Sequence, residues 1–184
     1  MLDVALVVAT NAVKAGQKIV FVTSKRQARD VVMAAAKDCG MPYITEKWRG
    51  GILTNFEIIS KNFKTLKNLN EKIASLEFTK LSNIEQNKIK EKAEKIERIF
   101  GGISELKKKP DMLFLIGAHD EQIALKEARN ENIPVIALAD TNADPEAINW
   151  PIPANDDATK SIRLLVETFS KAIKEIKPEK VKEV

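Results

Sequence analysis

The chain has 184 residues, of which 44% are hydrophobic, 30% are charged and 5% are aromatic. This length and composition fit one globular domain with a hydrophobic core, plus an additional segment. The formal net charge of +4 and the pI near 9.0 permit a polyanionic partner without requiring one. The low aromatic content argues against base stacking as the main means of binding.

Cys39 is the only cysteine and His119 is the only histidine. An internal disulfide is therefore excluded, a reducing compartment fits, and no zinc-ligand spacing exists. No apolar run approaches the 18 residues of a membrane span, and the start "MLDVALVVATNAV" indicates a helix instead of a signal peptide. We expect a cytoplasmic protein without a membrane partner.

The first part of the chain alternates helices and strands. Apolar periodicity predicts a helix over 3–15, and the β-branched run "KIVFV" (18–22) predicts a buried parallel strand. A helix capped by Ser24 then extends to about residue 37, and "MPYIT" (41–45) is a second, shorter strand. The segment "EKWRGGIL" (46–53) is a loop that leads into a different kind of structure.

Residues 54–100 contain neither Gly nor Pro and are rich in lysine. Two apolar series at spacings of four and three are separated by a break near residues 77–84, which predicts two antiparallel helices that form a coiled-coil hairpin. Each helix of about 20 residues would extend about 30 Å. The first series is Ile59, Phe63, Leu66, Asn70 and Ile73, and the second is Ile89, Ala93, Ile96 and Phe100. The expected division is a body of 1–53 and 101–177, a protruding hairpin of 54–100 and a flexible tail of 178–184.

Strand and helix patterns resume after Gly101. The predicted elements are strands at 112–117, 134–139 and 148–153, a helix from Asp120 to about 130, a turn at Asp144–Pro145, and a last helix to about 176 that is capped by Asn155 or Asp156. The fold class is therefore α/β: an open doubly wound (flavodoxin-like) parallel sheet with an inserted antiparallel coiled-coil helical hairpin.

Polar loops at the expected carboxyl ends of the strands resemble a ligand site. However, Ser24, Asp120, Asp144 and Asp156 each stand where a following helix needs an N-cap oxygen. The sequence also contains no G-x-G-x-x-G, G-x-x-x-x-G-K-[ST] or G-x-S-x-G motif. We expect no catalysis, no cofactor, no metal and no small-molecule substrate.

Three linked segments resemble one known family. The stretch "CGMPYITEKWRGGILTNFEII" (39–59) is similar to the "CGMPYVN-RWLGGMLTNF" segment of the bacterial small-subunit ribosomal protein S-two family. "KIVFVTSKRQARDVV" (18–32) resembles that family's "KILFVGTKKQAQ", and residues 100–165 resemble its carboxyl half. The resemblance covers nearly all of 2–176. It starts inside the helix that follows the family's usual amino-terminal segment, so we expect that segment to be lacking.

The resemblance implies a catalytically inert constituent of the small ribosomal subunit. Members have a doubly wound α/β body and a protruding coiled-coil hairpin, and they lie between the head and the body of the subunit. They bind small-subunit rRNA and neighbouring ribosomal proteins, and they help to recruit the large S-one protein where one exists.

Contacts with RNA phosphates need Lys, Arg or exposed backbone N–H groups. The lysines of the hairpin are equally explained by a solvated helix face, and the run 107–109 by a solvated loop. Trp48 could stack on a base or pack the hairpin against the body, and its place beside a Gly pair favours packing. The candidate RNA-binding residues are Lys25, Arg26, Arg29, Lys47, Trp48, Arg49, Asn55, Lys61, Lys64, Lys107, Lys108, Lys109 and Arg163.

Two other classes of function are alternatives to an RNA-bound ribosomal protein. The first is a small-molecule-binding α/β enzyme with a helical oligomerisation arm, which would need a phosphate loop or an acid pair at a strand end. The second is a coiled-coil interaction module outside the ribosome, in which Asn70 at a seam position would set the register with a partner helix.

Overall fold

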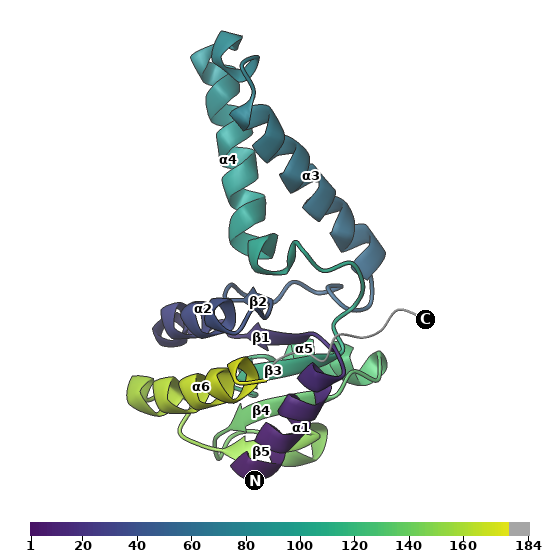
Figure 1. Cartoon of the computed structure of the whole chain (residues 1–184), viewed down its shortest axis with the longest axis vertical. Helices are drawn as coiled ribbons and strands as arrows, with labels where there is room; N and C mark the ends of the chain where they lie inside the picture. Colours follow the sequence, from purple (N-terminus) through teal and green to yellow (C-terminus); the bar gives the residue numbers. More distant parts are fainter. Residues whose placement is uncertain (177–184) are drawn as a thin grey trace.

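Five parallel strands form the centre of the protein (Figure 1). The computed structural model describes residues 1–176, and its strands are β1 (Ile19–Val22), β2 (Tyr43–Ile44), β3 (Met112–Ile116), β4 (Val135–Ala139) and β5 (Trp150–Pro153). Their order is β2-β1-β3-β4-β5, and each neighbouring pair is parallel. The winding direction changes between β1 and β3, so the predicted doubly wound sheet is confirmed, with the flavodoxin-like strand order.

Four helices cover the two faces of this sheet. Helices α1 (Leu2–Lys14), α2 (Arg29–Asp38) and α6 (Thr159–Lys174) share one hydrophobic core with one face of the strands. Helix α5 (Gln122–Asn130) packs on the opposite face. Right-handed crossovers from β1 to β2 and from β3 to β4 run in opposite directions along the sheet, which places α2 and α5 on opposite faces.

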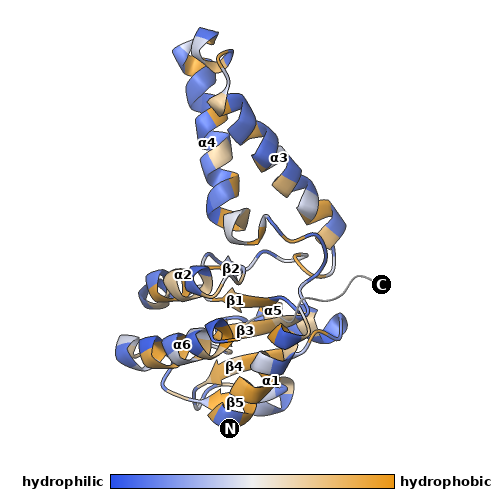
Figure 2. Cartoon of the chain, in the orientation of Figure 1, coloured by the Kyte–Doolittle hydropathy of each residue, from blue (hydrophilic) through white to orange (hydrophobic). Residues whose placement is uncertain are grey.

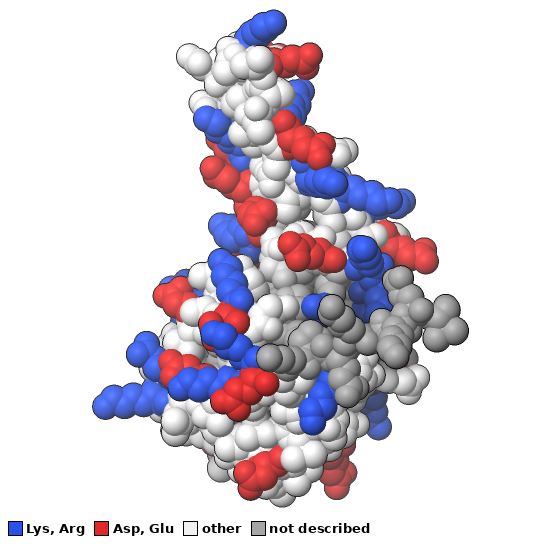
Figure 3. Space-filling model, in the orientation of Figure 1, with Lys and Arg blue, Asp and Glu red and all other residues white. Residues whose placement is uncertain are grey.

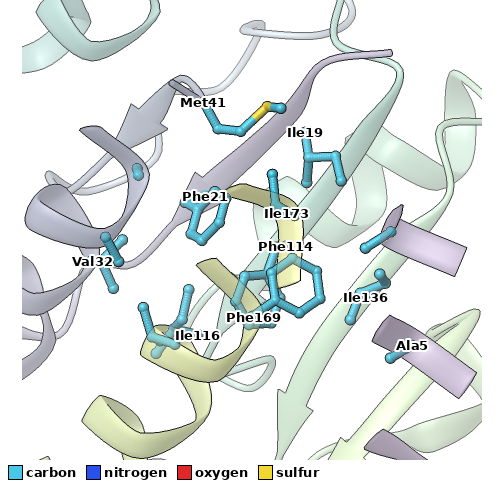
Figure 4. Close-up of a cluster of buried hydrophobic side chains, with 14 of the residues drawn as sticks. Ala5, Ile19, Phe21, Val32, Met41, Phe114, Ile116, Ile136, Phe169 and Ile173 are labelled. Carbon is cyan, nitrogen blue, oxygen red and sulfur yellow. The ribbon is translucent and has the colours of Figure 1, made fainter. Parts of the chain in front are cut away.

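Aromatic packing fixes α6 on its face of the sheet (Figure 4). The rings of Phe114 and Phe169 are stacked with centroids 4.1 Å apart, and Phe21 meets both of them edge-on at 5.3 and 5.8 Å. All three side chains are fully buried. Because buried aromatic pairs add to the stability that area burial already gives, this cluster makes α6 part of a rigid body.

The opposite face of the sheet carries the root of the helical arm. Alternate strand residues such as Val20 and Leu113 share a core with Ile52, Leu53 and Ile103, which flank the arm in sequence. Leu53 and Ile103 are 0% and 1% exposed. The arm therefore grows out of the folded core and not from a solvated linker.

The arm consists of α3 (Phe56–Ala74) and α4 (Asn83–Phe100), which are joined by a short 3-10 turn at Phe78–Lys80. Figure 2 shows a mostly hydrophilic arm above a body whose strands are hydrophobic. Phe56, Phe63 and Phe100 form an aromatic series at the root, with centroids 6.0 and 6.2 Å apart. The inward faces follow the predicted spacing.

The middle and the tip of the arm are stabilised in different ways. Asn70, expected on the apolar face, is exposed, so the hairpin is closed by its apolar neighbours and not by a buried amide. At the tip, Ser82 and Glu85 form a capping box at the start of α4, which satisfies backbone N–H groups that the helix leaves free.

The five predicted strands are all present, with β2 and β5 shorter than expected. Helix α2 begins at Arg29, after a 3-10 turn at Arg26–Ala28, instead of directly after Ser24. Among residues 1–176, no helix combines the length and the apolar character that a membrane crossing requires. The expected tail, 178–184, lies outside the described residues.

Candidate nucleic-acid interface

The loop between β2 and α3 presents polar side chains at the root of the arm. Lys47, Arg49 and Asn55 are exposed, whereas Trp48 is only 4% exposed and packs in the core beneath α5. The packing interpretation of Trp48 is confirmed, and its indole is not available as a stacking platform. Burial of the tryptophan turns its two charged neighbours outward.

This loop is folded around one carboxylate, that of Glu127 on α5. Its Oε1 accepts hydrogen bonds from the backbone N–H of Gly51 at 2.6 Å and from Trp48 Nε1 at 3.4 Å. Its Oε2 accepts from the N–H groups of Leu53 at 2.9 Å and Thr54 at 3.4 Å. Glu127 is 7% exposed, so these donors, rather than water, stabilise its charge.

The cations that follow β1 lie beside this loop, because β1 and β2 are parallel neighbours in the sheet. Arg26 is exposed in the 3-10 turn. Arg29 is half-buried, and its Nη1 donates to Glu46 Oε1 at 2.9 Å, which joins the start of α2 to the start of the loop. Arg26 is therefore the freer of the two for a phosphate contact.

Lys61 and Lys64 lie on the outward face of α3, opposite the buried Phe63 and Leu66. Neither lysine has an ion pair within residues 1–176. Figure 3 shows that acidic and basic side chains both line the arm. The arm is therefore a surface of mixed charge, and Lys61 and Lys64 lie in the first turns of α3.

The three lysines before β3 differ from one another. Lys107 is exposed, Lys108 Nζ pairs with Asp111 at 2.6 Å, and Lys109 Nζ pairs with Glu131 at 2.5 Å. The two pairs reduce the positive charge that this run presents to a polyanion. Lys107 is the strongest candidate of the three.

Arg163 lies elsewhere, on α6. It is exposed and lines a groove between α2 and α6, where acids outnumber cations: the other charged side chains are those of Asp30, Asp38, Glu167 and Lys171. Such a surface is unfavourable for phosphate. Arg163 is therefore the weakest of the exposed candidates.

The assignment of Lys25 to an RNA surface needs correction. Its side chain is 9% exposed, and its Nζ pairs with Asp156 at 2.5 Å, Asp157 at 2.7 Å and Asp120 at 3.1 Å. Burial favours a lower pKa for this lysine, but the hydrogen bonds that its ammonium group donates to the three carboxylates outweigh burial and raise the pKa above its usual range. Lys25 is a permanently charged internal cation that is already neutralised.

This cluster fills the place where an open α/β sheet normally binds a ligand, outside the carboxyl ends of β1 and β3. A Cβ at Gly117, which has a φ of +97°, would lie 2.6 Å from Lys25 Cε, so the lysine runs directly against the glycine backbone. Beneath it, Glu121 is 2% exposed and accepts from the Ser24 N–H at 2.5 Å. Burial raises the pKa of the Glu121 carboxyl.

Most of the predicted helix caps are not found in the structure. Asp144 does cap the 3-10 turn at Pro145–Ala147, as predicted. Ser24 and Asp120 make no side-chain cap, because their helices begin farther along the chain. Helix α6 also has no side-chain cap: Asn155 accepts from the N–H groups of Asp157 and Ala158 in the turn before the helix, and Asp156 turns inward to Lys25.

Comparison with known proteins agrees with this architecture. The family model described as "Ribosomal protein S2" matches residues 1–176. The "Small ribosomal subunit protein uS2" of Amoebophilus asiaticus is 44% identical over 162 residues, which cover 88% of this chain and 52% of that protein. Proteins of the same name from Cytophaga hutchinsonii and Nitratiruptor sp. are 39% and 43% identical, over 99% and 89% of this chain.

The chain belongs to the ribosomal protein S2 family. The resemblance found in the sequence motifs is thereby confirmed. The chain spans 52% and 61% of the lengths of the Amoebophilus and Nitratiruptor relatives, and 72% of that of the Cytophaga relative.

Two internal charges of this S2 family chain were missed by sequence reasoning. Glu127 stands on the buried side of α5, between Ala124 and Ala128, which are both fully buried. A glutamate at that helical position is a signal that the sequence does contain, because an acid among inward-facing residues needs internal donors. The partners of Lys25, by contrast, are 95, 131 and 132 positions away along the chain, and no local pattern indicates them.

Proposed function

We propose that this chain is a structural constituent of the small ribosomal subunit. In this role it binds small-subunit rRNA and neighbouring ribosomal proteins at the junction of head and body, and it supports translation in the cytoplasm. The observation that carries the proposal is the match of the S2 family model to residues 1–176. The names of the relatives describe proteins of the small subunit.

The RNA-binding surface in this proposal is the root of the arm. It combines exposed cations from the loops after β1 and β2 with the first turns of α3, and Asn55 adds a neutral polar side chain. A Lys or Arg that forms no ion pair with a carboxylate of the same chain is best able to release counterions from RNA phosphates. The proposed contacts are Arg26, Lys47, Arg49, Asn55, Lys61, Lys64 and Lys107, with weaker contributions from Arg29, Lys108, Lys109 and Arg163.

The assembly itself is tested by sedimentation of a cell lysate that contains a tagged copy of the chain. We expect the chain to migrate with free small subunits and with translating ribosomes. Recovery only in the soluble fraction at the top of the gradient would contradict the proposal.

The surface is tested by titration with small-subunit rRNA at several salt concentrations. Because each phosphate contact releases counterions, Lys47→Ala and Arg49→Ala should each reduce the slope of log K against log salt by about 1. Lys14→Ala and Lys160→Ala, which remove exposed cations from α1 and α6, are the matched controls and should leave the slope unchanged. Equal slopes for all four variants would remove the arm root from the interface.

A nucleotide-binding enzyme is the alternative that the structure argues against. The usual ligand crevice is occupied by the side chain of Lys25. We therefore expect nucleotides to produce no thermal stabilisation, whereas a ligand that binds the native state would raise the melting temperature.

A further inference from the structure

Glu127 joins two parts of the molecule that are far apart in sequence. It lies on α5, whose neighbouring residues Ala124 and Ala128 are fully buried against the sheet. All four of its hydrogen-bond donors belong to residues 48–54, the last segment before α3 begins at Phe56. The carboxylate therefore connects α5 to the loop that leads into the arm.

The geometry of this contact is that of an anion held in a cradle of backbone N–H groups. Gly51 adopts a φ of +95°, which lets the loop turn its N–H inward toward Oε1. Both carboxylate oxygens accept two donors each. Only an ionised carboxylate supplies acceptors on both sides, since an amide in its place would present an NH₂ group to two of the donors.

The other root of the arm is attached in a different way. Helix α4 ends at Phe100 and continues into a 3-10 turn whose Ile103 is 1% exposed. A Cβ at Gly102 would clash with the Tyr43 carbonyl oxygen of β2, so backbone packs on backbone there. Packing thus holds both roots, since Leu53 beside α3 is as buried as Ile103 beside α4, and the α3 root is held in addition by the buried charge of Glu127.

We propose that Glu127 is the positioning residue that sets the orientation of the arm on the body. With the carboxylate in place, both roots are fixed and the arm has one direction. Without it, the N–H groups of the loop lose their acceptors, the α3 root loosens, and the arm pivots about the packed root of α4.

The same contact orders the proposed RNA surface, and this part of the inference rests on the proposed function. Residues that face Glu127 alternate with residues that face solvent: Trp48 points inward, and Lys47 and Arg49 point outward. This contact between Glu127 and residues 48–54, which we call the clamp, therefore fixes the cations of the loop together with the direction of α3. Its loss should weaken RNA binding although no cation is removed.

The orientation is measured on the RNA-free protein by pulsed electron paramagnetic resonance. Spin labels on Lys80→Cys at the arm tip and Lys160→Cys on α6 report the direction of the arm, in a Cys39→Ala background. Labels on Lys67→Cys and Lys92→Cys report the integrity of the hairpin. All four lysines are exposed.

We expect Glu127→Gln to broaden the tip-to-body distance distribution and to leave the distribution within the hairpin unchanged. Glu167→Gln, the same exchange at an exposed position of α6, is the matched control and should match the wild-type protein. Glu127→Asp keeps the charge on a shorter side chain and should restore part of the narrow distribution. A folded Glu127→Gln protein with the wild-type tip-to-body distribution would overturn the proposal.

A second measurement needs no variant and protects the test if Glu127→Gln does not fold. In the wild-type protein, the amide proton of Gly51 should exchange slowly and resonate downfield, because it donates to a carboxylate at 2.6 Å. Exchange as fast as that of unprotected loop amides would contradict the clamp.

RNA titration then separates the two proposals. If the loosened arm has the binding-competent direction a tenth of the time, the affinity of Glu127→Gln falls about tenfold. The salt slope should stay at the wild-type value, since all cations remain. An arm that loosens without loss of affinity would support the clamp and refute the role of the arm in RNA binding. An arm that stays fixed would refute the clamp whatever the affinity.

Discussion

The carboxyl edge of the central strands and the root of the arm both contain a buried charge, but with opposite signs. At the edge, the cation of Lys25 lies inside and the carboxylates of Asp120 and Asp157 lie at the surface around it. At the arm root, the carboxylate of Glu127 lies inside and the cations of Lys47 and Arg49 lie at the surface. In each region, the named side chains at the surface carry the charge opposite to that of the buried Lys25 or Glu127.

This contrast separates two surfaces on one small protein. A phosphate backbone is repelled by the acids Asp120 and Asp157 at the strand edge and attracted by the cations assigned to the arm root, which include Arg26, the exposed neighbour of Lys25. Formal net charge does not reveal this, because a value of +4 over 184 residues averages both regions. If the proposed RNA surface is correct, we expect the orientation of this chain on RNA to follow from which charge is buried in each region.

The largest effect that tests the contrast is the loss of Asp156. Its side chain is 2% exposed and lies 2.5 Å from Lys25 Nζ. Asp156→Ala removes the most buried of the three carboxylates that pair with Lys25 and should lower the free energy of unfolding by about 2 kcal/mol, because Asp120 and Asp157 remain as partners. Urea denaturation measures this change.

The adjacent Asp157 provides the control for that variant. It contacts the same Lys25 Nζ at 2.7 Å, but its side chain is 75% exposed. Asp157→Ala should therefore cost less than about 1 kcal/mol. Equal losses for the two variants would show that Lys25 behaves as a surface cation, and the contrast between the two regions would fail.

A smaller effect is expected at the arm root from Trp48→Phe. The change keeps most of the buried aromatic surface and removes only the indole N–H that donates to Glu127 at 3.4 Å. Three backbone donors remain, so we expect a loss of about 1 kcal/mol in urea denaturation. No loss would mean that the backbone cradle alone satisfies the carboxylate.

The smallest effect concerns Glu121, a buried acid beneath the strand edge. Burial raises its pKa in the folded protein, so the folded state keeps the proton to a higher pH than the unfolded chain does. Its contribution to stability is complete below the unfolded value of about 4.3 and is lost as the pH rises through the raised folded pKa. Glu121→Gln removes this decline, and thermal denaturation across that pH range should show it as a flatter profile than that of the wild-type protein. Superimposable pH profiles of Glu121→Gln and the wild-type protein would contradict a raised pKa of Glu121 in the folded state.

The sequence predicted the sheet well because the information is local. The buried strands β1, β3 and β4 consist of consecutive apolar residues, and Gly16, Pro110 and Pro134 stand shortly before them. The arm was equally predictable from the sequence, since the apolar spacing of four and three decides which faces of α3 and α4 meet. Only Asn70, placed on that face by spacing, proved to be exposed.

The charged residues were harder to predict because their partners are distant in sequence. Asp156 has the local pattern of an N-cap, yet a lysine 131 residues away attracts it inward. Lys25 is predicted to contact RNA because phosphate contacts need Lys or Arg and it stands with Arg26 and Arg29 near the start of a helix. Strand order brings these residues together, and the spacing of residues along the chain does not contain that order.

The most direct test of the account is a cryo-microscopy reconstruction of small ribosomal subunits purified with this chain. We expect density for the chain in which rRNA phosphates lie within hydrogen-bonding distance of Lys47, Arg49 and the first lysines of α3, while the edge around Asp157 faces away from RNA. Small subunits that show no density for the chain would contradict its proposed place in the ribosome. Particles in which the acidic strand edge, and not the arm root, lies against the rRNA would contradict the proposed RNA surface.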